Sequence, residues 1–181
     1  MKILLVYPHY PATFWSFRYA MKFINRRASF PPLGLLTVAA MLPGTWEKRL
    51  VDMNVHPLTD EDLGWADYVF ISAMSIQRQS AREVIEDCRR LGVKTVAGGP
   101  LFTAYHEDFP EVDPLVLGEG EITLPPFLAD LRRGAPRRVY ATEGWAQLEK
   151  TPVPLWDLVN MKNYAAMNIQ YGRGCPFDCE F

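Results

Sequence analysis

Short apolar runs alternate with segments of helical periodicity along most of this chain, and no other feature constrains the fold as strongly. Residues 2–7 form an apolar run without the apolar–polar alternation of a half-exposed strand, which predicts a strand buried on both faces, and residues 68–72 are a further predicted buried strand. The predicted strands are residues 2–7, 46–52, 68–72, 94–97 and 114–117. Strands that alternate with helices are typical of an α/β fold with a parallel sheet.

Helix start and stop signals separate these runs. Pro32 opens the first helix, and Thr59 with Asp62 three residues later resembles the capping box of a short second helix. A third helix ends at Gly92, and Thr123 caps a fourth. Residues at helical spacing form the apolar face of the third helix: Ala81, Val84, Ile85, Cys88 and Leu91. Cys88 is therefore expected in the core.

The order of these elements leaves few topologies, because parallel crossovers are right-handed. We predict a flavodoxin-like (Rossmann-like), doubly wound, five-stranded parallel sheet of strand order 2-1-3-4-5, followed by a C-terminal extension. Residues 137–140 favour an edge strand, and residues 167–171 favour a further strand. We place the domain boundary near residue 140, which predicts a domain of residues 1–140 and a linker with the start of a second domain in residues 141–181.

The connection between residues 8 and 31 is long and aromatic. Phe14, Phe17, Met21 and Ile24 recur in it at helical spacing. Two interpretations remain open, a surface helix packed on the core and a lid over a ligand.

Ligands of open parallel sheets bind beyond the carboxyl ends of the strands, so the residues at these ends form the candidate site. Small residues follow the third, fourth and fifth strands, and such residues let a ligand approach backbone N–H groups closely. The candidate site comprises Ser72, Ala73, Met74, Gly98, Gly99, Pro100, Gly118, Glu119 and Gly120. The alternative is that the glycines serve only the turns that every α/β fold needs.

Missing features exclude several classes of ligand and partner. The loop that starts at Pro8 has neither the glycine pattern of a dinucleotide fold nor the hydroxyl-rich phosphate loop of a flavin mononucleotide site. A receiver domain needs acidic residues where this chain has Tyr7, Pro8 and Ser72. A net charge of −2 predicts no nucleic-acid partner. No apolar run is long enough to span a bilayer, and the odd number of cysteines argues against a disulfide framework, so we expect a cytoplasmic protein.

Cys175 and Cys179 stand four positions apart, with Gly172, Arg173 and Gly174 before them and Phe181 after them. On spacing alone, the pair is incidental, half of a zinc site, or part of an iron–sulfur loop. A zinc site needs four ligands, and no third or fourth cysteine or histidine lies nearby in the sequence.

The order of several short motifs adds to these features. They are residues 31–35 (Pro-Pro-Leu-Gly-Leu), 50–52 (Leu-Val-Asp), 98–100, 118–119, 152–157 (Pro-x-Pro-x-Trp-Asp) and the cysteine loop. Together they resemble the cobalamin-dependent radical S-adenosylmethionine (radical SAM) enzymes, in which a flavodoxin-like cobalamin domain precedes a radical SAM barrel. The cysteine loop resembles their Cys-x3-Cys-x-aromatic-Cys sequence. Residues 13–17 further resemble the subgroup that contains the hopanoid C-2 methylases.

This resemblance implies cofactors and roles for individual residues. The strand-end residues named above would line the slot for the nucleotide tail and corrin edge of cobalamin (B12). Cys175 and Cys179 would bind two irons of a [4Fe–4S] cluster, and Phe181 would pack on the adenine of S-adenosylmethionine. The third cluster cysteine and the barrel are absent from the chain, so we expect it to be inactive alone. His9 lies where many cobalamin domains carry a cobalt-ligating histidine, but it lacks the flanking Asp and Gly, so we expect a polar loop residue.

The implied function is the N-terminal cobalamin-binding portion of a C-methyltransferase. The parent enzyme would act on an unactivated carbon of a small-molecule or lipid substrate, through a 5′-deoxyadenosyl radical and methylcobalamin. The cofactors would carry this chemistry, and the protein would position them. Two alternatives remain, a non-catalytic Rossmann-like regulatory or interaction domain and a B12-type domain that has lost its ligand.

Overall fold

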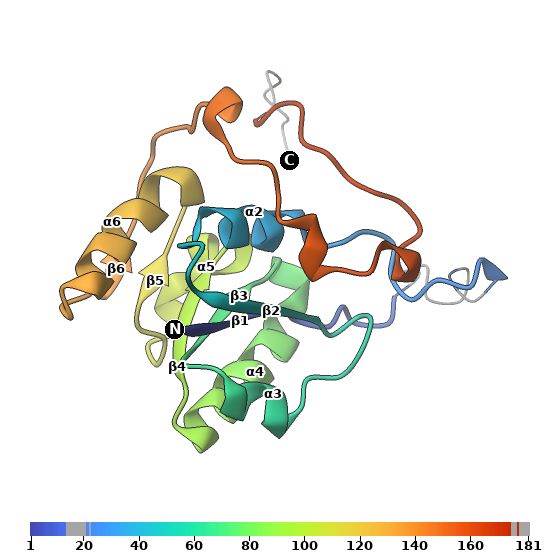
Figure 1. Cartoon of the computed structure of the whole chain (residues 1–181), viewed down its shortest axis with the longest axis horizontal. Helices are drawn as coiled ribbons and strands as arrows, with labels where there is room; N and C mark the ends of the chain where they lie inside the picture. Colours follow the sequence, from blue (N-terminus) through green and yellow to red (C-terminus); the bar gives the residue numbers. More distant parts are fainter. Residues whose placement is uncertain (14–20, 22, 175–176, 178–181) are drawn as a thin grey trace.

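Six parallel strands form one sheet in the computed structural model, which describes residues 1–13, 21, 23–174 and 177 (Figure 1). The strand order is β2-β1-β3-β4-β5-β6. The strands are β1 (Lys2–Tyr7), β2 (Glu47–Asp52), β3 (Tyr68–Ser72), β4 (Lys94–Gly98), β5 (Leu115–Val116) and β6 (Val139–Tyr140). The predicted flavodoxin-like fold and the order 2-1-3-4-5 are confirmed, but the sheet has a sixth strand where five were expected.

The sixth strand, β6, lies within the predicted edge strand and extends the sheet beside β5. Leu115 N donates a hydrogen bond to Arg138 O at 2.7 Å, and Leu117 N donates to Tyr140 O at 2.8 Å. Tyr140 Oη also donates to Asp130 Oδ2 at 2.8 Å, which ties β6 to the preceding helix. A strand of two residues has no apolar periodicity that reveals its place in a sheet.

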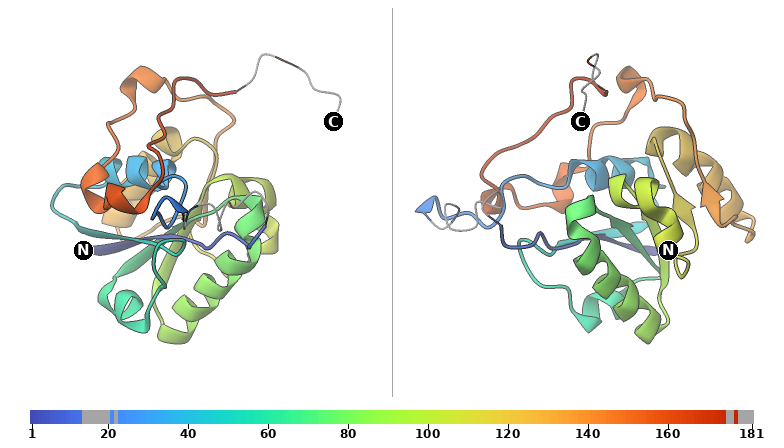
Figure 2. Two further views of the ribbon diagram at one scale, coloured as in Figure 1. Left: turned by 90° about the vertical axis from the view of Figure 1, so that its right-hand side faces the viewer. Right: turned by 180° about the vertical axis from the view of Figure 1, so that it is seen from behind.

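Helices cover both faces of the sheet (Figures 1 and 2). One face carries α2 (Leu33–Met41) and α6 (Gly120–Arg132), and the other carries α3 (Asp60–Trp65), α4 (Arg78–Leu91) and α5 (Pro100–Tyr105). Ile3 and Leu5 of β1 pack into the first layer, whereas Leu4 and Val6 pack into the second. Because both faces are buried, the four central residues of the strand, residues 3–6, are all apolar. The short 3-10 helices are η2 (Ser75–Gln77), η3 (His106–Asp108), η4 (Leu148–Lys150), η5 (Trp156–Leu158) and η6 (Met161–Asn163).

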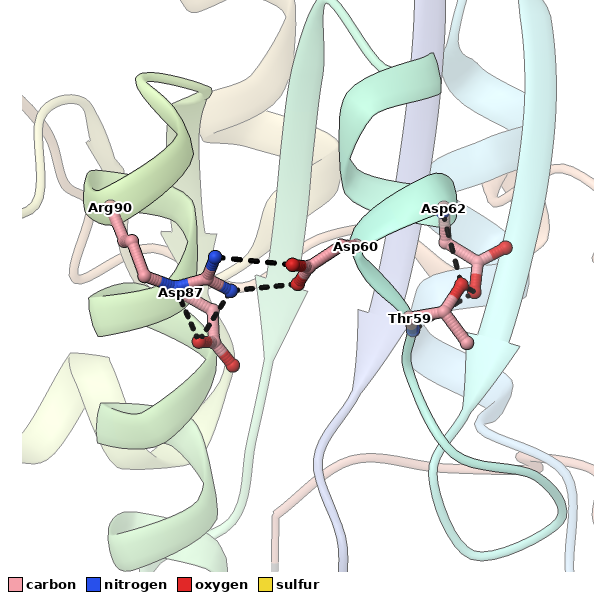
Figure 3. Close-up of polar contacts among 5 residues, drawn as sticks. All are labelled: Thr59, Asp60, Asp62, Asp87 and Arg90. Atoms are coloured by element: carbon pink, nitrogen blue, oxygen red, sulfur yellow. Dashed lines mark hydrogen bonds and ion pairs between the residues drawn. The ribbon is translucent and has the colours of Figure 1, made fainter.

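The capping box predicted for α3 is present, and an ion pair joins this helix to α4 (Figure 3). Thr59 Oγ1 accepts a hydrogen bond from Asp62 N at 3.2 Å, and Thr59 N donates to Asp62 Oδ2 at 3.1 Å. Arg90 donates to both carboxylate oxygens of Asp60, at 3.1 and 2.7 Å, and also contacts Asp87. These charged side chains are exposed, so solvent screens the pair and it contributes little to the stability of the fold.

The structure differs from the sequence predictions at several helix ends. No predicted element corresponds to α5, because residues 98–100 resemble a turn, yet Pro100 is the first residue of a helix, where proline is tolerated. The helix α6 begins at Gly120 rather than after a Thr123 cap. Gly92 caps the C-terminus of α4, as predicted, and has a left-handed φ of 69°. The apolar face of α4 includes buried Cys88, as predicted, but Leu91 is 38% exposed.

After β6 the chain folds back over the face that carries α2 (Figure 1). Leu155 N donates a hydrogen bond to Leu36 O at 3.0 Å. Tyr164 forms an isolated parallel bridge with Ala28, and its Oη donates to Asp52 Oδ2 at 3.1 Å. These contacts join the segment after residue 140 to the sheet domain.

The strand predicted over residues 167–171 is wrong. These residues are irregular and pair with no strand in the part of the chain that the structure describes, and Ile169 and Tyr171 are 81% and 100% exposed. An apolar segment forms a strand only where a partner strand is available to hydrogen-bond with it. The prediction of a helix or lid between residues 8 and 31 falls largely on residues 14–20 and 22, which lie outside the described ranges.

Candidate functional site

A cavity of about 1020 Å³ opens at the carboxyl ends of β1, β3, β4 and β5, between these strand ends and α2. Its volume is at the top of the ~300–1,000 Å³ range of small-molecule sites, which suits a large ligand. All the strand-end residues predicted from the sequence line it: Ser72, Ala73, Met74, Gly98, Gly99, Pro100, Gly118, Glu119 and Gly120. They meet because the carboxyl ends of parallel strands lie along one edge of the sheet.

Glycine stands at these positions for different physical reasons. A Cβ on Gly98 would lie 2.5 Å from Val116 O, and a Cβ on Gly99, whose φ is +83°, would collide with Ser72 Oγ. Gly98 therefore needs glycine for its close approach to the backbone of β5, and Gly99 needs it for its left-handed φ, whatever the cavity holds. A Cβ on Gly120 would meet only Val38 Cγ2, at 3.8 Å, so this glycine leaves open space beside α2.

Two tyrosines at the end of β1 form a wall that the sequence analysis did not assign to the site. Tyr7 and Tyr10 both line the cavity, and their hydroxyl groups hydrogen-bond to each other. Their rings meet edge to face, with centroids 5.7 Å apart, and Tyr10 Oη donates to Met74 Sδ at 3.4 Å. Burial raises the pKa of Tyr7 far above its ordinary value, so this hydroxyl stays protonated. The only sequence signal was the aromatic content of the loop after the first strand.

Asp52 and Asn54, at the end of β2, set the position of the loop that carries Tyr10. Asn54 Oδ1 accepts from Tyr10 N at 2.8 Å, and Asn54 Nδ2 donates to Pro8 O at 3.2 Å and to Asp52 Oδ1 at 2.8 Å. Burial raises the pKa of the Asp52 carboxyl, and hydrogen bonds from Asn54 and Tyr164 only partly oppose this shift. His9 of the same loop is exposed at the rim of the cavity, where its backbone N donates to Ser80 Oγ at 3.0 Å.

Charged side chains gather where α6 begins. The guanidinium of Arg173 donates to Glu121 Oε1 at 2.6 Å and Oε2 at 3.0 Å, and it also pairs with Glu119. Thr151 Oγ1 donates to Glu121 Oε1 at 2.9 Å. Burial alone would raise the pKa of Glu121, but hydrogen bonds from Arg173, its own backbone and Thr151 outweigh burial and lower it. Glu119, Glu121 and Arg173 all line the cavity. Because Arg173 lies more than 50 positions from both glutamates, no local sequence pattern indicates these contacts.

The residues predicted to bind an iron–sulfur cluster and S-adenosylmethionine, Cys175, Cys179 and Phe181, lie outside the described ranges. Among the described residues, no group of three or more His, Cys, Asp or Glu side chains forms a candidate metal site. Within the same ranges, no helix combines the length and apolar character needed to cross a membrane.

Comparison with protein families identifies the cavity-bearing domain. The model of the "B12 binding domain" family matches residues 23–128, which run from before α2 into α6 and include every predicted strand-end residue. The chain belongs to the B12-binding domain family. The prediction of a cobalamin domain is therefore confirmed.

Three curated relatives of this B12-binding chain are larger enzymes. An uncharacterized methyltransferase of Synechocystis is 40% identical over 100% of this chain, which covers 34% of that protein. The hopanoid C-2 methylase of Rhodopseudomonas palustris is 35% identical over 99% of the chain, which covers 35% of it. The anaerobic magnesium-protoporphyrin IX monomethyl ester cyclase of Synechocystis is 27% identical over 100% of the chain, which covers 42% of it. The chain thus spans between a third and about two fifths of these relatives.

The residues of the cavity fit cobalamin. Gly120 leaves space that a side chain would fill, and the enclosed Oδ1 of Asn168, which lines the same cavity, has no hydrogen-bond partner among the described residues. Apolar walls from α2 combined with a few polar groups are the composition expected of a site for a large organic cofactor.

Proposed function

We propose that this chain is the N-terminal, cobalamin-binding part of a radical SAM C-methyltransferase. The observation that carries the proposal is the large cavity at the strand ends of a B12-binding domain, walled by the predicted residues. The chain is similar along nearly its whole length to a hopanoid C-2 methylase and to another methyltransferase, and this similarity supports methyl transfer as the reaction class. A small-molecule or lipid substrate and a cytoplasmic location are part of the same proposal.

The role of this chain is to hold and orient the cofactor. Cobalamin, when bound, supplies a transferable methyl group. The strand ends at Ser72 and Gly98 would contact the nucleotide tail and the corrin edge, and Gly120 would give them room beside α2. The hydroxyl of Tyr7, which burial keeps protonated, pairs with that of Tyr10 and gives the cavity a polar surface at the end of β1. We assign residue 140 as the approximate end of this cobalamin domain.

The cysteine loop would serve the second cofactor system. We assign Cys175 and Cys179 as two thiolate ligands of a [4Fe–4S] cluster, and Phe181 as the residue that packs on the adenine of S-adenosylmethionine. The chain covers only about a third of its methyltransferase relatives, so the remaining ligands and the substrate site would come from the part that it does not span.

Titration of this chain with hydroxocobalamin, followed by absorbance and by thermal unfolding, tests the proposal. Ligand at one hundred times Kd should stabilise the folded chain by about 2.7 kcal/mol. At about 2–4 °C per kcal/mol for a domain of this size, the unfolding midpoint should rise by roughly 5–11 °C. Flavin mononucleotide at the same concentration serves as the control and should produce no shift. No binding at millimolar hydroxocobalamin would instead support a B12-type domain that has lost its ligand.

A further inference from the structure

The outer wall of the cavity is formed by a segment that lies outside the family match. Asn168, Ile169, Gln170 and Arg173 line the cavity, whereas the B12-binding match ends at residue 128. We name residues 168–173 the C-terminal strap. We propose that the strap is part of the cobalamin site, with Asn168 as a ligand of the corrin carboxamides and Arg173 as the positioning residue that holds the strap in place. The inference rests on the proposed function.

Arg173 fixes one end of the strap to the beginning of α6. Its guanidinium faces Glu121 with two nitrogens and also contacts Glu119, which is the forked geometry that makes arginine–carboxylate pairs strong. The side chains of Arg173, Glu119 and Glu121 are only 17%, 18% and 14% exposed, so salt screens their attraction less than it screens a surface pair. Both carboxylates lie where α6 begins, Glu119 at its N-cap and Glu121 in its first turn, and both line the cavity.

The residues just before the strap are anchored independently. Ala165 N and Ala166 N donate hydrogen bonds to Ala28 O and Ser29 O, each at 3.0 Å. Tyr164 Oη reaches the buried carboxylate of Asp52. The chain is therefore held on both sides of residues 168–170, while these residues themselves lie along the cavity.

Two side chains of the strap lack the surroundings that their chemistry requires. The Oδ1 atom of Asn168 is enclosed without a hydrogen-bond partner among the described residues, and an unsatisfied buried acceptor is unfavourable. Ile169 lines the cavity but remains 81% exposed. The rim of a corrin ring carries carboxamide groups on an otherwise apolar ring. A carboxamide both donates and accepts hydrogen bonds, as Asn168 does, and an apolar ring would cover Ile169.

Affinity measurements on this chain with two corrinoids test the inference. Hydroxocobalamin carries the nucleotide tail, whereas dicyanocobinamide lacks it and keeps the corrin carboxamides. Asn168→Leu should weaken both by the same factor, at least fivefold, because the lost contact is to the ring. Arg173→Gln should also weaken both, and it should raise hydrogen exchange in residues 165–174 without changing exchange in the sheet.

Arg90→Gln is the matched control. It removes an arginine that also holds a carboxylate with two nitrogens, but on α4, away from the cavity (Figure 3). It should leave both affinities unchanged. The double variant Asn168→Leu/Arg173→Gln should bind little more weakly than Arg173→Gln alone, because the strap is already released.

The outcomes separate this inference from the proposed function. If the unmodified chain binds neither corrinoid, the proposed function fails. If it binds both, and folded Asn168→Leu and Arg173→Gln chains bind as tightly as the unmodified chain, the strap is not part of the site. If Asn168→Leu weakened the binding of hydroxocobalamin but not that of dicyanocobinamide, the assignment of Asn168 to the corrin ring would be overturned. Arg173→Lys, which keeps the charge but not the fork, provides a second variant should Arg173→Gln fail to fold.

Discussion

Gly120 offers a direct test of where cobalamin lies, because a side chain can be added there without straining the backbone. Its φ is not left-handed, and its Cβ would make an ordinary contact with Val38 Cγ2 at 3.8 Å. Gly120→Ala should therefore fold normally, with up to about 1 kcal/mol of added stability from the higher helix propensity of alanine. Gly99 is unsuitable, since its φ of +83° and the collision with Ser72 would destabilise any variant.

Gly120→Leu carries the same Cβ and adds three further carbon atoms, which must extend into the space between α6 and α2. We expect Gly120→Ala to keep its affinity for hydroxocobalamin and Gly120→Leu to lose at least tenfold, or about 1.4 kcal/mol, because steric exclusion removes the bound position. Absorbance titration measures the affinity, and thermal unfolding without ligand confirms that each variant is folded.

Gly64→Leu is the matched control for this series. Gly64 lies in α3, on the opposite face of the sheet, with no atom within 4 Å of its added Cβ, and it does not line the cavity. It introduces the same side chain into a helix and should leave cobalamin affinity unchanged. A well-folded Gly120→Leu chain that binds as tightly as Gly64→Leu would show that cobalamin does not occupy the space beside α6.

Three further predictions concern groups that are buried or partly buried. Tyr164→Phe removes the hydrogen bond to Asp52, so the free energy of unfolding in urea should fall by about 1–3 kcal/mol, and an unchanged midpoint would contradict this. The pKa of Glu121 lies below its ordinary value of 4.5, so its stabilisation is complete above pH 4.5 and is lost as the pH falls through the folded-state pKa. The protection factors of the strap amides, which correct for the intrinsic pH dependence of hydrogen exchange, should therefore fall on acidification below pH 4.5, and should fall less in Glu121→Gln. Burial raises the pKa of the Cys88 thiol to about 12, so in a Cys175→Ser/Cys179→Ser background a thiol reagent at pH 8 should label it only after unfolding. Rapid labelling of the folded chain would refute this.

The sequence predicted those elements whose signals are local. The capping box of Thr59 and Asp62 and the left-handed Gly92 depend on a few neighbouring residues, and both are present in the structure. The fully buried strands were recognisable because helices cover both faces of the sheet. The strand-end residues could be assigned to one cavity because parallel topology alone brings them together.

The features that the sequence did not predict depend on distant partners. The strand β6 lies within the predicted edge strand, but its place beside β5 depends on the hydrogen bonds that Leu115 and Leu117 donate to it. Residues 167–171 are irregular although they have strand-like composition. The contact of Arg173 with Glu119 spans 54 positions, and that of Tyr164 with Asp52 spans 112. No local pattern encodes such pairs, so the outer wall of the cavity could not be predicted from the sequence and was found only in the structure.

These long-range contacts also set an order of assembly. A ribosome makes the chain from its N-terminus, and domains fold as they emerge. All the strand ends that form the floor of the cavity, together with α2 and α6, are complete once residue 132 has been synthesised. Arg173, which secures the outer wall, emerges later and finds its carboxylates already in place. A chain synthesised only as far as residue 132 therefore contains the floor of the cavity but not its outer wall.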